Sequence, residues 1–213
     1  MGKINQGILG GFSGKVGNVI GGNWKGIDYM RVKPASVANP QTEGQVDQRT
    51  KFSTVLKFLQ PMTDFVRVGY KLYATKMTQF NSAMSYNLKN AITGTYPDYT
   101  IDYANALVSR GNLTGVLNPA ATSSSPGEVS FTWDNNTGNG NALATDKALL
   151  VVHNASKGVA AYETAGAGRS NTSDSITVPA DFSGDTVEVF IGFISEDGKE
   201  VSNSAYVGSV TVA

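Results

Sequence analysis

The stretch that decides the fold is Thr186-Val-Glu-Val-Phe-Ile-Gly-Phe-Ile-Ser195, which is followed by the pair Asp197-Gly198. Its β-branched and aromatic residues favour a strand, and Asp-Gly is a frequent turn of β-hairpins. Similar short β-prone runs occur at regular spacing before and after it. These runs are Thr100–Val108, Glu128–Trp133, Lys147–His153, Gly158–Glu163, Ser175–Val178 and Tyr206–Val212.

Seven short strands over roughly 100 residues are typical of an immunoglobulin-like or fibronectin-III-like β-sandwich. Trp133 lies on an early strand of this series. Because a Trp at such a position packs between the two sheets of these sandwiches, we expect Trp133 in the core. The sequence therefore predicts a C-terminal sandwich module, a fold that by itself assigns no function.

The N-terminal part is rich in glycine and then becomes helical. Nine glycines lie within residues 2–26, and the runs Lys15–Ile20 and Ile27–Val32 flank the segment Gly21–Gly26. They predict a β-hairpin with a glycine-rich loop and Trp24 near its tip. A capping box at Thr42 predicts a helix that ends before Pro61. A second helical pattern extends from Phe65 to Ile92, so two or three helices are expected, and the fold class is α+β.

Charge also divides the chain, although its 17 basic and 17 acidic residues cancel. Residues 1–120 hold 13 basic and six acidic residues, a net charge of +7; residues 121–213 hold four and eleven, a net charge of −7. We expect a basic α+β module at residues 1–98 and a sandwich module at residues 99–213. A polar, turn-rich stretch at residues 118–127 reads as a linker.

Several kinds of chemistry are excluded or disfavoured by composition. The chain has no cysteine and one histidine, His153, so it has no disulfide, thiolate metal site or multi-histidine centre. Gly14-Lys15 does not fit a P-loop, because Leu9 and Val16 replace the first glycine and the hydroxyl residue. The oxygen-rich loop Asp134–Asn141 departs from the EF-hand pattern. We expect no catalytic residue, no cofactor and no metal.

Other motifs resemble known proteins. The strings Gly10–Ile20, Trp24–Gly26, Arg31–Pro34 and Asn39–Phe52, together with Trp133-Asp, Asp146–Ala148 and Val201–Gly208, resemble an uncharacterised bacterial family of about 210 residues with no assigned function. Residues 10–58 also resemble the start of small structural proteins of tailed phages. That resemblance implies no catalytic residues.

These observations favour a non-enzymatic structural or assembly protein, phage- or prophage-like, that self-associates as an oligomer or filament through its N-terminal segment. The expected contacts are the large apolar side chains there: Ile4, Ile8, Leu9, Phe12 and Trp24. Two alternatives stay open. One is a binding module whose sandwich recognises a glycan or protein, for which Tyr162 and Asn154 qualify; the other is nucleic-acid binding by the basic N-terminal half.

The sequence also bears on localisation. Its first residues lack the apolar core of a secretory signal, and no apolar run reaches the roughly 20 residues that span a bilayer. We therefore expect cytoplasmic synthesis, incorporation into a virion or another assembly, and no membrane partner.

Overall fold

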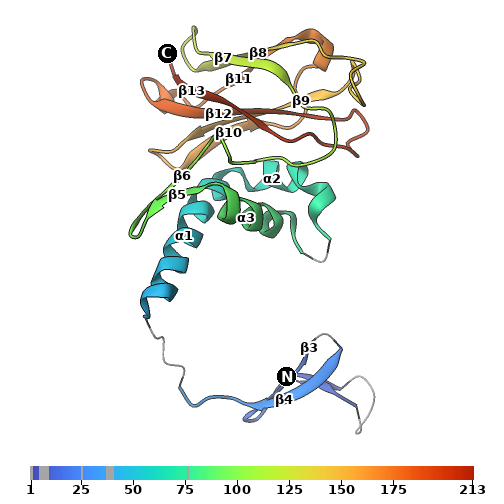
Figure 1. Ribbon diagram of the computed structural model, residues 1–213, viewed down its shortest axis with the longest axis vertical. Helices are drawn as coiled ribbons and strands as arrows, with labels where there is room; N and C mark the ends of the chain where they lie inside the picture. Colours follow the sequence, from blue (N-terminus) through green and yellow to red (C-terminus); the bar gives the residue numbers. More distant parts are fainter. Residues whose placement is uncertain (1, 5–9, 25, 37–40, 76) are drawn as a thin grey trace. The chain divides into compact units, whose positions relative to one another are not determined.

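The chain divides into two units, Met1–Thr42 and Glu43–Ala213 (Figure 1). The computed structural model describes residues 2–4, 10–24, 26–36, 41–75 and 77–213. The predicted module boundary at residue 98 does not coincide with this division, because the helices that follow residue 42 share a hydrophobic core with the C-terminal strands.

The larger unit contains a β-sandwich of two antiparallel sheets. One sheet has the strand order β10-β9-β12-β13 and the other has the order β11-β8-β7. The strands are β7 (Leu117–Thr122), β8 (Glu128–Asp134), β9 (Lys147–Asn154), β10 (Val159–Glu163), β11 (Ser173–Thr177), β12 (Thr186–Ile194) and β13 (Ala205–Thr211). Six of the seven predicted strands correspond to β8 to β13.

The remaining sandwich strand, β7, lies where the sequence predicted a linker. Strand β7 pairs with β8 at the edge of its sheet, and its register shifts between Leu117 and Ala120. Asn118 has a positive φ of 45° there, and Pro119 follows it. An edge strand with a bulge tolerates a proline that cannot donate to the ladder. The linker prediction for residues 118–127 was therefore wrong in its first half.

The two sheets pack through alternate residues of their strands. Odd-numbered residues of β12, from Val187 to Phe193, and the even-numbered apolar residues of β9 share the inner face of their sheet, and they pack with Phe131 and Trp133 of β8 in the other sheet. Trp133 is 3 % exposed, and its ring lies edge-on to Phe193 with centroids 5.6 Å apart. Its predicted place in the core is confirmed.

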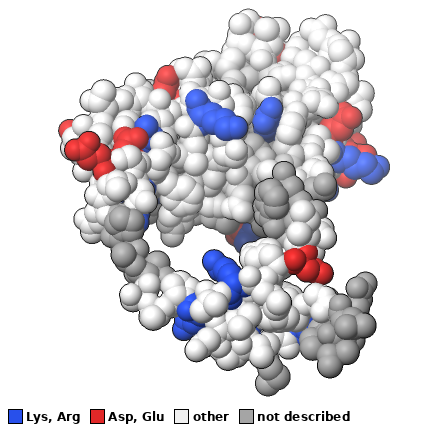
Figure 2. Space-filling model, turned by 60° about the horizontal axis from the view of Figure 1, so that its bottom comes forward, with Lys and Arg blue, Asp and Glu red and all other residues white. Residues whose placement is uncertain are grey.

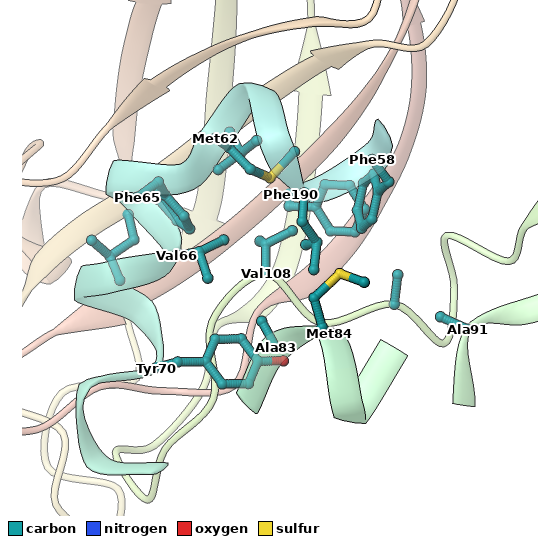
Figure 3. Packing of buried hydrophobic residues seen from close by; sticks show 14 of the residues in the cluster. Phe58, Met62, Phe65, Val66, Tyr70, Ala83, Met84, Ala91, Val108 and Phe190 are labelled. Carbon is teal, nitrogen blue, oxygen red and sulfur yellow. The ribbon is translucent and has the colours of Figure 1, made fainter. Parts of the chain in front are cut away.

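The outer face of the β10-β9-β12-β13 sheet carries a second core, beneath a helical layer. Helices α1 (Glu43–Leu59), α2 (Thr63–Gly69) and α3 (Gln79–Asn90) contribute to it, with short 3₁₀ turns at Gln60–Met62 and Lys71–Tyr73. In Figure 3 their apolar side chains converge on Phe190 of β12. The helical pattern from Phe65 to Ile92 is divided between α2 and α3. Helix α3 begins after Thr78, whose side chain caps it by accepting a hydrogen bond from the Asn81 amide at 3.2 Å.

A two-stranded hairpin and a long connection follow α3. The hairpin pairs β5 (Ile92–Thr95) with β6 (Asp98–Ile101). The strand predicted at Thr100–Val108 is wrong beyond Ile101, because side chains hold that backbone instead of a sheet. Asn87 donates to the Leu107 carbonyl at 2.9 Å and accepts from the Leu107 amide at 3.0 Å. The connection thereby fastens the helical layer to the sandwich.

A buried ion pair closes one end of the sandwich. The Arg169 guanidinium lies 3.1 Å from the Asp146 carboxylate, and both side chains are fully buried. Arg169 also donates to Asn136 Oδ1 at 2.7 Å and to the carbonyls of Thr114 and Gly115, and it lies 3.9 Å from the Phe193 ring centroid. One carboxylate oxygen of Asp146, Oδ1, is buried and has no hydrogen-bond partner in the described part of the chain. Through these contacts the Arg169 guanidinium joins the chain segments around Thr114, Asn136 and Asp146.

The N-terminal unit is a four-stranded antiparallel meander in the order β1-β2-β3-β4. Its strands are β1 (Lys3–Ile4), β2 (Phe12–Val16), β3 (Val19–Trp24) and β4 (Ile27–Val32). The predicted glycine-rich loop is wrong: Gly21 and Gly22 lie within β3 and pair with Met30 and Tyr29. Trp24, at the end of β3, is next to the turn as predicted.

Close backbone approach explains the glycines in β3. A Cβ atom on Gly21 would lie 2.1 Å from the Phe12 carbonyl oxygen and 2.6 Å from the Phe12 ring. A Cβ on Gly22 would lie 3.0 Å from the Tyr29 ring. Aromatic side chains of the neighbouring strands thus cover two successive glycines, a known way of stabilising glycine-containing strands.

Candidate functional site

Strand β4 is an unusually apolar edge strand. All six of its residues are exposed, and Ile27, Met30 and Val32 have exposed fractions of 65, 72 and 72 %. Since successive side chains alternate between the faces of a sheet, Ile27 and Tyr29 lie on one face and Met30 and Val32 on the other. Among the described residues of the N-terminal unit, β4 pairs only with β3. Within that described part, its outer backbone edge is therefore free and is flanked by apolar side chains.

The N-terminal unit has almost no interior. Among its residues whose exposure the structure describes, only Gly21 is buried. The unit holds five basic residues and one acidic residue, a net charge of +4, so the larger unit carries −4. Figure 2 shows charged side chains scattered over a largely uncharged face. The basic residues predicted to form one N-terminal half are divided between the two units.

The predicted assembly contacts are only partly described. Ile8 and Leu9 lie outside the described residues. Ile4 and Trp24 belong to β1 and β3, but the structure describes their backbone alone. Phe12 begins β2 and is half-buried over Gly21. The apolar residues of β4 were missed as contacts, although their sequence was assigned to a strand, because their exposure depends on where the sheet ends.

A hollow of about 810 Å³ lies in the larger unit, beside the only histidine of the sequence. The end of α1, strand β6 and the turn after β9 form its walls. His153 lines it, is 3 % exposed, and meets Phe58 edge-on with ring centroids 5.2 Å apart. Neither ring nitrogen forms a hydrogen bond with any residue that the structure describes. Burial lowers the pKa of His153 to about 4, so its ring is neutral at pH 7.

The residues that qualified for glycan contact have structural roles. Asn154 is fully buried, donates to Asp185 Oδ2 at 2.7 Å and accepts from the Lys157 amide at 3.2 Å. The ring of Tyr162 packs edge-on against Phe65, with centroids 6.0 Å apart. These two residues are therefore not an exposed sugar-binding pair.

The oxygen-rich loop Asp134–Asn141 is occupied by protein contacts. Asn136 Oδ1 accepts from Arg169, and Asn141 Oδ1 accepts from the Thr114 amide at 2.8 Å. The positive charge of the Arg169 guanidinium at this loop repels a metal cation. Across the described residues, no three acidic or histidine side chains group closely enough to hold a metal ion. No helix of the described segments is both long and apolar enough to cross a bilayer.

A family model matches residues 11–208, which is nearly the whole chain. The chain belongs to DUF6266, a family of unknown function. No curated protein matches it. Among solved structures, the fn3 domain of the human collagen alpha-1(XX) chain is similar at 15 % identity and a TM-score of 0.36, over 49 % of this chain and 92 % of that one.

Membership of DUF6266 confirms the predicted kinship with an uncharacterised family. The family assigns no activity to any residue. The resemblance to tailed-phage proteins is not shown by these comparisons and remains a proposal.

Proposed function

We propose that this DUF6266 member is a non-enzymatic assembly protein whose N-terminal sheet joins copies of the chain into an oligomer or filament. The observation that carries the proposal is the free edge of β4 with its exposed apolar side chains. The resemblance of residues 10–58 to tailed-phage structural proteins further supports a place in a virion or a similar assembly.

The small size of the N-terminal unit supports association. A polypeptide of this length buries too little surface to be stable alone, and chains below about 40 residues usually need a metal, a disulfide or a partner. The described part of the unit has no buried side chain, and its sequence has no cysteine. Burial of Met30 and Val32 against a neighbour contributes about 1.5–3 kcal/mol for each side chain.

The edge of the sheet supports the same proposal. Natural proteins protect edge strands by shortness, charge, proline or a covering element, because open amides and carbonyls attract another strand. Strand β4 is six residues long, and four of these residues are exposed apolar ones. Addition of a strand from a second copy pairs the free edge, while the side chains on both faces supply the contact.

Sedimentation velocity of the full chain tests the proposal. At about 50 μM, in the range of ordinary oligomer affinities, we expect the wild type to sediment as oligomers. Met30→Lys/Val32→Lys and a chain of residues 43–213 are expected to be monomers, because both lack the apolar edge. The shortened chain retains both hydrophobic cores, whose buried members all lie between Val55 and Val212.

Two lysines introduced elsewhere provide the control. Leu143 and Met77 are exposed apolar residues of the larger unit, so Leu143→Lys/Met77→Lys adds the same charge and should associate like the wild type. Measurements at low salt and at about 0.5 M salt separate edge pairing from attraction between the +4 and −4 units, which salt screens. A wild type that stays monomeric in both buffers refutes the assembly role.

A further inference from the structure

Several polar side chains that line the hollow beside His153 have no partner among the described residues. Thr54, Tyr99, Ser156 and Lys157 on its wall are bonded within the protein. The other polar side chains of the lining make no hydrogen bond or ion pair with a described residue: Lys57, Gln60, Thr100, Tyr103 and His153. Such convergence of free polar groups in a concave site is typical of ligand-binding pockets.

His153 lies behind the lining of the hollow. It is 3 % exposed and both ring nitrogens are buried, so they do not reach a ligand. Because burial lowers its pKa, the ring is neutral at pH 7 and adds no charge to the site. The side chains of Gln60, Thr100 and Tyr103 both donate and accept hydrogen bonds, so they match the hydroxyl groups of a ligand.

The charge of the lining favours an anion. Two lysines and no acidic residue line the hollow. Lys157 is already neutralised by Asp185, whose carboxylate lies 2.7 Å from its ammonium. Lys57, in the last turn of α1, pairs with no acidic side chain of the described residues and is therefore the cation that we assign to a ligand.

The aromatic lining favours a ring-shaped molecule with an apolar face. Phe58 and Tyr103 contact each other edge-on, with centroids 5.8 Å apart, and both line the hollow. Tyr103 is held by a stacked contact with Tyr206, with centroids 6.0 Å apart. Burial raises the pKa of the Tyr103 hydroxyl, which stays protonated and can donate a hydrogen bond.

We propose that this hollow binds an anionic sugar, a hydroxylated ring that carries a carboxylate or a phosphate. The anionic group pairs with Lys57, the ring hydroxyls bond with Gln60, Thr100 and Tyr103, and the apolar face of the ring lies against the Tyr103 ring. This site lies wholly within the larger unit and does not depend on the assembly role of β4.

Titration of the full-length protein with three small sugars tests this site. The probes are glucuronic acid, glucose 6-phosphate and neutral glucose. The binding of each is measured by calorimetry and by NMR of the His153 imidazole. Since His153 is the only histidine, its ring signals are a unique reporter at the floor of the hollow. We expect saturable heat and a saturable shift of these signals with at least one anionic sugar, and much weaker binding of glucose.

Substitutions on the rim locate the binding. Lys57 is exposed, so Lys57→Gln should fold normally and lower the affinity for the anionic sugar about fivefold, the loss that follows removal of one exposed charge pair. Lys89→Gln, at an exposed lysine of α3 outside the lining, should leave the affinity unchanged.

The three probes give distinct outcomes. Binding of glucuronic acid alone identifies a carboxylate ligand, and binding of glucose 6-phosphate alone identifies a phosphate ligand. Equal shifts with glucose, or His153 signals that no sugar moves, overturn the proposal.

Discussion

Replacement of Arg169 by methionine is expected to lower the free energy of unfolding by about 3–5 kcal/mol, because it leaves the Asp146 carboxylate charged and buried without its partner. Methionine retains much of the side-chain volume over Phe193, so the effect reports the lost charge and hydrogen bonds. The variant also leaves Asn136 Oδ1 and the Thr114 carbonyl without their donor. Urea unfolding monitored by circular dichroism measures the difference.

Two companion variants separate the buried pair from ordinary charge loss. Arg169→Met/Asp146→Asn removes both charges, and we expect it to recover part of the lost stability, since no unpaired charge remains buried. Arg67→Met breaks the exposed pair with Asp64, at 2.6 Å, and should cost less than about 1 kcal/mol. Equal losses for Arg169→Met and Arg67→Met would show that burial of the Arg169 pair is unimportant.

The second large effect is expected on acidification. His153 has a pKa of about 4 in the folded protein and about 6.5 when unfolded, so the unfolded chain binds the proton more readily between these values. The folded state therefore keeps its full stability above pH 6.5 and loses about 3 kcal/mol as the pH falls to about 4. Burial is the cause of the lowered pKa of His153. The expected loss of stability on acidification therefore does not depend on neighbouring charged groups.

Comparison with His153→Phe isolates this contribution from that of the carboxylates. Phenylalanine does not titrate, and it suits the contact with Phe58. The difference in unfolding free energy between wild type and variant should change by about 3 kcal/mol between pH 7 and pH 4. A constant difference across this range contradicts the buried, neutral histidine. Glu188, the cross-strand neighbour of His153, is present in both proteins, so its own titration cancels in the difference between their unfolding free energies.

The strands of the sandwich were predictable because their signals are local. Runs such as Lys147–His153 and Thr186–Ser195 are long, β-branched and bounded by turn residues, and they became β9 and β12. The strand predicted beyond Ile101 failed because distant side chains, including Asn87 and Ser204, hold its backbone. The predicted module boundary at residue 98 differs from the observed division after Thr42. A helical pattern indicates that one face of a helix is buried, but it does not indicate which part of the chain covers that face.

The candidate site was less predictable than the fold. His153 ends the apolar run Lys147–His153, a position typical of a structural histidine, and it is buried there. The hollow beside it is formed by α1, β6 and the turn after β9, which are distant in sequence. Likewise, the exposure of Met30 and Val32 follows from β4 being the last strand of its sheet, which a hairpin pattern does not reveal.

Amide hydrogen exchange of residues 27–32 tests the central claim most directly, because it reports on the free edge of β4 itself. If copies associate through this edge, the protection of these amides rises as the protein concentration passes through the range in which oligomers form. The β5–β6 hairpin serves as the internal reference, with unchanged protection. Exchange of residues 27–32 at one rate in monomer and oligomer alike would contradict assembly through β4.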